Sequence, residues 1–309
     1  MSVLRARPLL GTRVDISVEG LPESEANAAI DAAFAEIAEV HRLMSFHEPG
    51  SDVSRLNRIA AAEAITIDAR THAVIAFAQD LAAVSGGVFD ISIGGHLVAW
   101  GYLPAPDAPA PDPAATWRDI VLESGNRVRF ARPLWIDLGG IAKGYAVDRA
   151  VKAMALPADV QCVINAGGDL RVTGPRPERI ALRVPGETLA KEAIPAIEIA
   201  GGSLASSSGS EHARVHQGLT VGPHLNGASR GGVSGGTAST TRFVSVTAAE
   251  CMTADALTKV VMAAGVDAEP VLRRYGAAAY LYESGGWRIL EHRSEEWEPV
   301  FGEGDVTKL

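Results

Sequence analysis

The sequence predicts an α+β protein in which short strands and amphipathic helices share a core. Val14, Ile16 and Val18 alternate with polar residues, which indicates a strand with one buried face. The segment 26–40 instead carries apolar residues at three- and four-residue spacing, which is typical of a helix with one face toward a core. Both patterns recur along the 309 residues and are interspersed, so the fold class follows from their mixture.

The expected elements can be placed in chain order. Gly20, Leu21 and Pro22 end the first strand, and Ser24 is expected to cap the first helix. A second helix is expected from about Thr71 to Val84. Apolar alternation then predicts strands at 120–122, 128–130, 160–164, 170–172 and 181–184, around one helix over Lys143–Met154.

Two segments are expected to lie largely outside regular structure. Five prolines between Leu103 and Thr116 favour extended, unpaired backbone, so 103–116 is predicted to be a surface loop. Residues 201–241 are mostly Gly, Ser, Thr and Ala, which are too small to build a core face, so most of this stretch is predicted to be loop around short strands. Beyond it we expect a strand at 243–246, a helix over 252–264 and a closing hairpin of 280–282 with 287–290.

Composition restricts the partners of the chain. The net charge of −9 and the pI near 5.4 leave no broad cationic surface for nucleic acid or anionic lipid. We find neither a membrane-spanning apolar run nor a signal peptide, so no membrane anchor is expected and the default location is the cytoplasm. Cys162 and Cys251 lie in apolar stretches and are expected to pack in the core.

Two glycine pairs follow apolar segments and are candidates for ligand binding. Asp137–Gly144 is expected to run from a strand end into a helix start, where free backbone amides attract phosphate. Asn165–Asp169 could bring bare backbone close to a ring or a phosphate. A structural explanation stands beside each, because glycine pairs also form tight turns. The usual nucleotide spacings, GxxxxGK[ST] and GxGxxG, are absent from the first segment.

Two further segments have a structural and a functional interpretation. Gly86 and Gly87 end an expected helix, which helix capping alone explains. Asp255 lies in the first turn of the helix 252–264, where it suits the helix dipole and forms an i,i+4 pair with Lys259 worth about 0.3–0.5 kcal/mol. The alternative is that Asp255 binds a hard cation.

Taken together and in this order, these segments resemble the ApbE family of flavin transferases. The resemblance spans roughly residues 8–285, and the block DLGGIAKGYAVD is its most specific part. The matching segments are Leu10–Thr12, Met44–Ser45, Ser51–Asn57, Gly86–Asp90, Asp137–Asp148, Asn165–Asp169 and Ala254–Leu257. The folded unit is expected to span residues 5–290, with 291–309 as a C-terminal tail.

The resemblance implies a fold of mixed, mostly antiparallel sheets flanked by helices, with an FAD cleft between sub-regions. It also implies an enzyme that binds FAD and Mg²⁺ and transfers the FMN moiety to a threonine or serine hydroxyl of an acceptor flavoprotein, with release of AMP. Residues matched to flavin contacts are Leu10, His47, Val88, Phe89, Asp90, Asp137, Lys143, Gly167 and Gly168.

The resemblance further implies a metal site and a base. The metal would be bound by the main-chain oxygen of Gly140, by Asp255 and by a hydroxyl residue four positions later. Lys259 stands at that last position, so either Thr258 supplies the hydroxyl or the Lys259 ammonium replaces part of the metal charge. His224 and Asp255 are the expected catalytic residues, with His224 as general base although the aspartate that usually follows it is missing.

Alternatives to FMN transfer remain open at this stage. One is hydrolysis of FAD to FMN and AMP with water as nucleophile. Another is a non-catalytic FAD-binding protein in which Lys259 occupies the cation position. A third is self-modification at Ser234–Thr240, whose composition resembles a flavin-acceptor motif.

Overall fold

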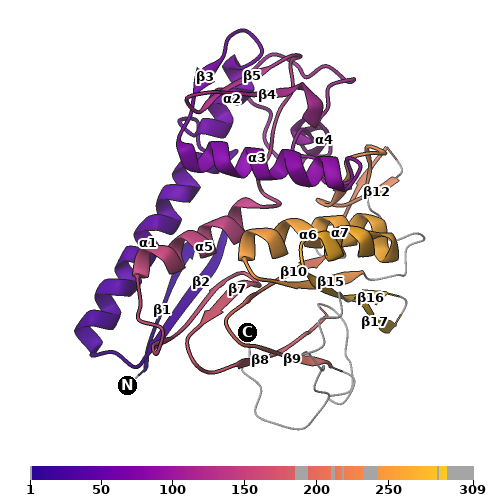
Figure 1. The fold of residues 1–309 in the computed structure, drawn as a ribbon. Helices are drawn as coiled ribbons and strands as arrows, with labels where there is room; N and C mark the ends of the chain where they lie inside the picture. Colours follow the sequence, from indigo (N-terminus) through magenta and orange to yellow (C-terminus); the bar gives the residue numbers. More distant parts are fainter. Residues whose placement is uncertain are drawn as a thin grey trace.

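An eight-stranded sheet forms the centre of the fold in this computed structural model, which describes residues 2–184, 194–209, 213–217, 219–232, 242–283 and 285–290 (Figure 1). All neighbouring strands in this sheet are antiparallel. In spatial order they are β1 (Ser2–Leu9), β2 (Thr12–Glu19), β6 (Gln161–Ala166), β7 (Asp169–Thr173), β10 (Ser203–Ser208), β15 (Phe243–Ala248), β16 (Ala278–Glu283) and β17 (Gly286–Leu290).

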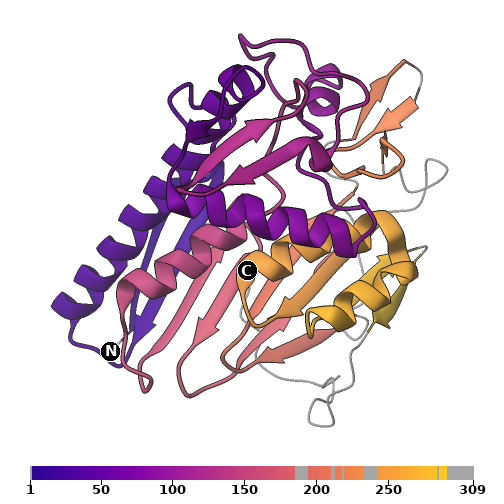
Figure 2. The same cartoon turned by 45° about the horizontal axis from the view of Figure 1, so that its top comes forward.

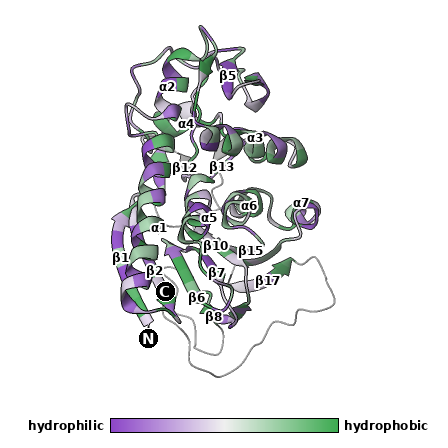
Figure 3. Cartoon of the chain, turned by 60° about the vertical axis from the view of Figure 1, so that its left-hand side comes forward, coloured by the Kyte–Doolittle hydropathy of each residue, from purple (hydrophilic) through white to green (hydrophobic). Residues whose placement is uncertain are grey.

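Helices cover one face of the sheet, and α5 lies between α1 and α6 (Figures 1 and 2). These helices are α1 (Glu23–Met44), α5 (Ala142–Met154) and α6 (Cys251–Ala264), followed by the short α7 (Glu269–Arg274). Residues of α6 are buried around most of its circumference, and Figure 3 shows this helix as mainly hydrophobic. The opposite face of the sheet packs against the hairpin of β8 (Glu178–Ala181) and β9 (Ala196–Ile199) in a separate apolar cluster.

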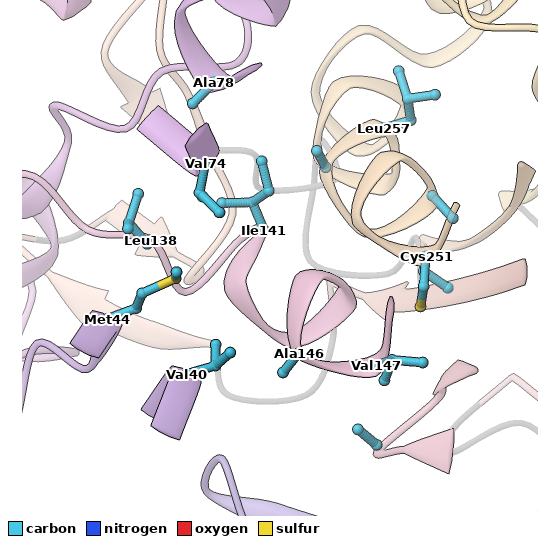
Figure 4. Close-up of a cluster of buried hydrophobic side chains, with 14 of the residues drawn as sticks. Val40, Met44, Val74, Ala78, Leu138, Ile141, Ala146, Val147, Cys251 and Leu257 are labelled. Atoms are coloured by element: carbon cyan, nitrogen blue, oxygen red, sulfur yellow. The ribbon is translucent and has the colours of Figure 1, made fainter. Parts of the chain in front are cut away.

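An upper layer lies on the far side of α5 and α6 from the sheet (Figure 1). It contains α2 (Asp52–Ile59), α3 (Ala69–Val84), α4 (Gly94–Ala99) and a small sheet of β3 (Ile65–Thr66), β5 (Arg127–Phe130) and β4 (Ile120–Glu123). Figure 4 shows part of the core that joins the layers, with Val40 of α1, Val74 of α3 next to Ile141, and Leu257 of α6 in one apolar cluster. Two further hairpins pair β11 (Arg214–His216) with β12 (Leu219–Val221), and β13 (Leu225–Asn226) with β14 (Gly231–Gly232).

The predicted fold class is confirmed, as are most of the predicted elements. The strand expected before Gly20, observed as β2, occurs within a few residues of its expected bounds. So do the helices near 71–84, 143–154 and 252–264, the strands near 120–130 and 160–172, and the closing hairpin. Residues 103–116 contain neither helix nor strand, as their prolines predict. Cys162 and Cys251 are buried and unpaired. In the described part of the chain, no helix has the length and apolar character needed to cross a membrane.

Three expectations about elements were wrong, and two helices were missed. Helix α1 starts at Glu23 after Pro22, and no side chain caps it, so Ser24 lies inside the first turn. The expected strand at 181–184 lies earlier, as β8. Residues before Asp137 form no strand: the Ile136 amide donates to the Asn57 side chain on α2, and the Asp137 amide donates to the Ile91 carbonyl. Helices α2 and α4 were not predicted, since each is too short to show a clear period.

The serine-rich stretch departs most from expectation, because β10 is a central strand of the main sheet. Its small side chains allow α6 to lie close above it. The hydroxyls find partners there: Ser207 Oγ lies 2.8 Å from Thr258 Oγ1 on α6, and Ser206 Oγ lies 2.8 Å from Ser245 Oγ on β15. The motif at 234–240 and the tail at 291–309 lie outside the described residues, and the expected 5–290 boundary stays a prediction.

Candidate functional site

A cavity of about 430 Å³ lies between the upper layer and the α1–α5–α6 layer. Its wall is mainly apolar on the side of the upper layer and carries lysine side chains on the side of α5 and α6. Most of the residues predicted to bind flavin or to act in catalysis line it: Leu10, His47, Val88, Phe89, Asp90, Asp137, Gly140, Lys143 and His224. Segments far apart in the sequence therefore meet at one cavity.

The segment that carries Asp137 is held from two sides. The side-chain amide of Asn57 donates to the Ile136 carbonyl at 3.1 Å, and its oxygen accepts from the Ile136 amide at 2.8 Å. The Asp137 amide donates to the Ile91 carbonyl at 2.8 Å. Asp137 Oδ2 accepts from the Gly139 amide at 3.1 Å, and burial raises the pKa of this carboxyl to about 6. Asp137 is thus fixed at the cavity wall with a carboxyl that titrates near neutral pH.

The start of α5 is occupied by a side-chain carboxylate. Asp255 on α6 accepts a hydrogen bond from the Gly144 amide at 3.1 Å through Oδ2. The two helices approach closely here, since a Cβ atom on Gly144 would lie 2.3 Å from the Cys251 carbonyl oxygen. The helix N-terminus therefore interacts with an anion of the protein itself, rather than presenting this amide to a phosphate as expected.

Two lysines and two aspartates form an ion cluster beneath the cavity. Lys143 pairs with Asp169 and lies 3.5 Å from Asp255 Oδ2, and Lys259 Nζ lies 2.6 Å from Asp255 Oδ1. Burial alone would raise the pKa of Asp255, but the two ammonium groups outweigh burial and hold that pKa at about 2. Burial alone would lower the pKa of Lys143, but the carboxylates of Asp169 and Asp255 outweigh burial, so the pKa is raised. Asp255 and Lys143 are therefore charged at neutral pH.

The surroundings of Asp255 do not fit the magnesium site that the resemblance implies. Both carboxylate oxygens already have ammonium or amide partners. The Thr258 hydroxyl is buried and donates to the Asp255 carbonyl at 2.7 Å. The stem of Lys259 passes Gly140, where an added Cβ atom would lie 3.4 Å from Lys259 Cγ. Within the described ranges, no group of three His, Cys, Asp or Glu side chains is arranged to hold a metal.

His224 lies at the same end of the cavity as the lysines. Burial, together with the charges of Lys259 and Lys143, lowers its pKa to about 3, so the imidazole is neutral at physiological pH. Nε2 lies 3.2 Å from the Ser208 carbonyl oxygen, so Nε2 carries the proton and Nδ1 is left as the acceptor. The geometry is compatible with a proton acceptor of low basicity.

Some predicted residues lie away from the cavity. Gly167 and Gly168 form the β6–β7 turn with φ of +64° and +98°, which favours glycine. They line a second cavity, of about 400 Å³, that includes Thr12. Asp255 and Thr258 are fully buried beneath the first cavity. The turn at Gly167 and Gly168 agrees with the structural explanation of the second glycine pair, and the flavin contact expected there stays a prediction.

Three residues of the site had no predicted role. Arg230 forms an ion pair with Asp90 at 3.0 Å, so this aspartate ties the 88–92 segment to the loop after β13. Ser207 is a partner of Lys259, and Asn57 holds Ile136. Asn57 belongs to the matching segment Ser51–Asn57, which could have indicated that Asn57 has a role but not that its partner is Ile136. Arg230 and Ser207 lie in a Gly- and Ser-rich stretch whose pattern indicates loop, so no sequence signal identified them.

Known proteins similar to this chain share its fold and parts of its sequence. The FAD:protein FMN transferase of Rhodobacter capsulatus is 31% identical over 193 residues, covering 58% of this chain and 37% of the relative. That of Klebsiella pneumoniae is 26% identical, covering 65% of this chain and 62% of the relative. The chain thus spans less than two thirds of the length of these relatives.

Solved structures match over nearly the whole chain. The ApbE protein of Thermotoga maritima superposes with a TM-score of 0.79 at 26% identity, covering 96% of this chain and 97% of that one. The flavin transferase ApbE of Vibrio cholerae gives a TM-score of 0.75 at 22% identity, covering 94% and 96%. The model of the ApbE family matches residues 10–281. With the family's sequence model and fold both matched over most of its length, this chain belongs to the ApbE family.

Proposed function

We propose that this chain binds FAD in the first cavity and transfers the FMN moiety to a threonine or serine hydroxyl of a partner protein, with release of AMP. The observation that carries the proposal is that apolar and positively charged side chains line different parts of the cavity wall. Leu10, Val88 and Phe89 supply apolar surface for a ring, and Lys143 and Lys259 supply positive charge for phosphates. The relatives named FAD:protein FMN transferase support the same reaction.

The proposed reaction is a displacement at phosphorus. The acceptor hydroxyl oxygen attacks the phosphorus of the FMN half of the pyrophosphate, and a phosphodiester bond forms. The bond from that phosphorus to the bridging oxygen breaks, and AMP leaves with the electron pair. The hydroxyl proton passes to a base and then to solvent. Catalysis requires alignment of the two oxygens and positive charge near the bridging oxygen, where negative charge develops.

Four groups at the lysine end of the cavity have a proposed part in this step. Lys143 and Lys259 stabilise the charge that develops on the leaving phosphate. Asp255 touches both lysines and acts by positioning them. His224 accepts the hydroxyl proton at Nδ1, and the negative charge of bound FAD would raise its low pKa toward the range where a base is effective.

A transfer assay tests the proposal. The protein is incubated with FAD and a library of peptides, each with one threonine or serine, and AMP release is measured alongside peptide mass. The expected result is AMP formation that depends on peptide, together with a phosphodiester-linked flavin on the modified peptide. Asp255→Asn should abolish both signals. Intact FAD after prolonged incubation with every peptide, and with proteins co-expressed as acceptors, would contradict the proposal.

The same assay separates the two alternative functions. Equal AMP release with and without peptide would indicate FAD hydrolysis with water as nucleophile. Tight FAD binding without any product would indicate a non-catalytic flavin-binding protein. This is the second candidate, because the Lys259 ammonium already has an oxygen acceptor for each of its three N–H donors. The proposed reaction does not involve magnesium, although the resemblance implies that ion, because the surroundings of Asp255 do not fit it.

A further inference from the structure

The ammonium group of Lys259 is held by three oxygen atoms. Nζ lies 2.6 Å from Asp255 Oδ1, 2.9 Å from Thr258 Oγ1 and 3.0 Å from Ser207 Oγ. An ammonium group has three N–H donors, so each donor has an acceptor. The lysine side chain is mostly buried, and its stem is packed beside Gly140. The positive charge is therefore fixed at one place at the cavity wall.

The charges around this ammonium leave little attraction for a further cation. Lys143 and Lys259 balance Asp169 and Asp255, so the cluster has no net charge when all four groups are ionised. A divalent ion at Asp255 would have to displace the Lys259 ammonium and would lie close to Lys143. Charges a few ångströms apart in a buried site repel strongly because the effective dielectric is low. With threonine at position 259, the cluster would instead carry one net negative charge.

We propose that the Lys259 ammonium takes the place of a divalent cation, so that this chain binds the pyrophosphate of FAD without magnesium. This inference rests on the proposed function, because it places the phosphates of FAD at the lysine end of the first cavity. The protein supplies a fixed univalent charge where a bound divalent ion would otherwise have to be recruited from solution. Substitution of Lys259 should therefore create a dependence on magnesium that the natural chain lacks.

Binding of FAD to the purified protein tests this directly. The dissociation constant is measured from quenching of flavin fluorescence, once in excess EDTA and once in excess magnesium chloride. For the natural chain, the two values should agree within about twofold. For Lys259→Thr, FAD should bind at least about tenfold more weakly in EDTA, which corresponds to about 1.4 kcal/mol, and should recover in magnesium. Lys152→Thr, at an exposed lysine on α5 remote from the cavity, is the matched control.

The possible outcomes separate this inference from the proposed function. FAD binding by the natural chain that appears only with magnesium would overturn the inference and leave the proposed function standing. Calorimetric titration of the natural chain with magnesium chloride alone should show no binding, and binding that Asp255→Asn removes would also overturn the inference. Absence of FAD binding in both buffers would overturn the proposed function and the inference together. Should Lys259→Thr fail to fold, as judged by circular dichroism, the EDTA comparison and the titration of the natural chain decide the question.

Discussion

Asp148 on α5 and Asp255 on α6 each cap the helix on which the other stands. Asp148 accepts hydrogen bonds from the amides of Cys251 at 3.0 Å and Met252 at 2.8 Å, at the start of α6. Asp255 accepts from the Gly144 amide at the start of α5. Each carboxylate lies at the positive end of a helix dipole, and each also pairs with a basic side chain. This reciprocal capping fixes α5 and α6 relative to each other, and these helices carry Lys143 and Lys259.

Replacing Asp148 by alanine should lower the free energy of unfolding by about 2–4 kcal/mol. The change removes two amide acceptors and leaves the partly buried Arg171 without its carboxylate partner. Urea denaturation measures the loss. Lys152→Ala on the same helix removes only an exposed ion pair and should cost less than about 0.5 kcal/mol. Equal losses for the two variants would show that the reciprocal capping of α5 and α6 contributes nothing to the free energy of unfolding.

Gly144→Ala should destabilise the protein even though alanine favours helix by about 1 kcal/mol. The new Cβ atom would lie 2.3 Å from the Cys251 carbonyl oxygen and 2.8 Å from Asp255 Cβ, so α5 and α6 would have to move apart. We expect a loss of about 1–3 kcal/mol in urea denaturation and weaker FAD binding. Gly50→Ala is the control, because nothing lies within 4 Å of its Cβ position. A Gly144→Ala protein as stable as the natural one would contradict the close approach.

Much of the fold can be predicted from local patterns, because burial on one face of a helix or strand repeats along the sequence. This is why β2, α3, α5 and α6 were expected near their observed places. Strand β10 could not be found in this way. Its serines look like loop residues until their partners are known, and Ser207 meets Thr258 across 51 positions of sequence.

The candidate site could likewise be predicted only in part from the sequence. The recognised motifs indicated the residues that line the cavity, including Phe89 and Lys143. What each residue contacts depends on long-range packing that no motif encodes. The fit of Lys259 among Asp255, Thr258 and Ser207 needs a strand and a helix to be placed together. From the sequence, Lys259 could be noted as unusual, but whether Thr258 or its own ammonium took the cation position stayed open.

Asn57→Leu should reduce both stability and FAD affinity. The substitution keeps a similar side-chain size but leaves the buried amide and carbonyl of Ile136 without their partners, at about 1–3 kcal/mol for each. Because Asp137 follows directly, its position at the cavity should loosen, and the dissociation constant for FAD should rise. Gln79→Leu removes hydrogen bonds to Ile120 and Trp117 in the upper layer, away from the cavity. It should lower stability alone, and a parallel loss of FAD affinity would contradict the positioning role of Asn57.

Asp137 and His224 should affect the pH dependence of stability in opposite directions. The pKa of Asp137 is raised to about 6, so its folded-state advantage is complete below about pH 4 and is lost as the pH rises through 6. The pKa of His224 is lowered to about 3, so its advantage is complete above about pH 6.5 and is lost as the pH falls toward 3. In the natural chain these two slopes partly cancel between pH 4 and 6, and single substitutions should reveal each one.

The comparison of two variants at two pH values tests these signs. Raising the pH from 4 to 7 should make Asp137→Asn more stable relative to the natural chain by about 1–3 kcal/mol, since the variant no longer has a carboxyl that must ionise in a buried place. The same change should make His224→Gln less stable relative to the natural chain, because only the natural chain regains the advantage of a neutral imidazole. Urea denaturation of the natural chain and both variants at each pH provides the free energies that are needed. Shifts of the same sign in the two variants would show that at least one of these groups does not have the environment described for it.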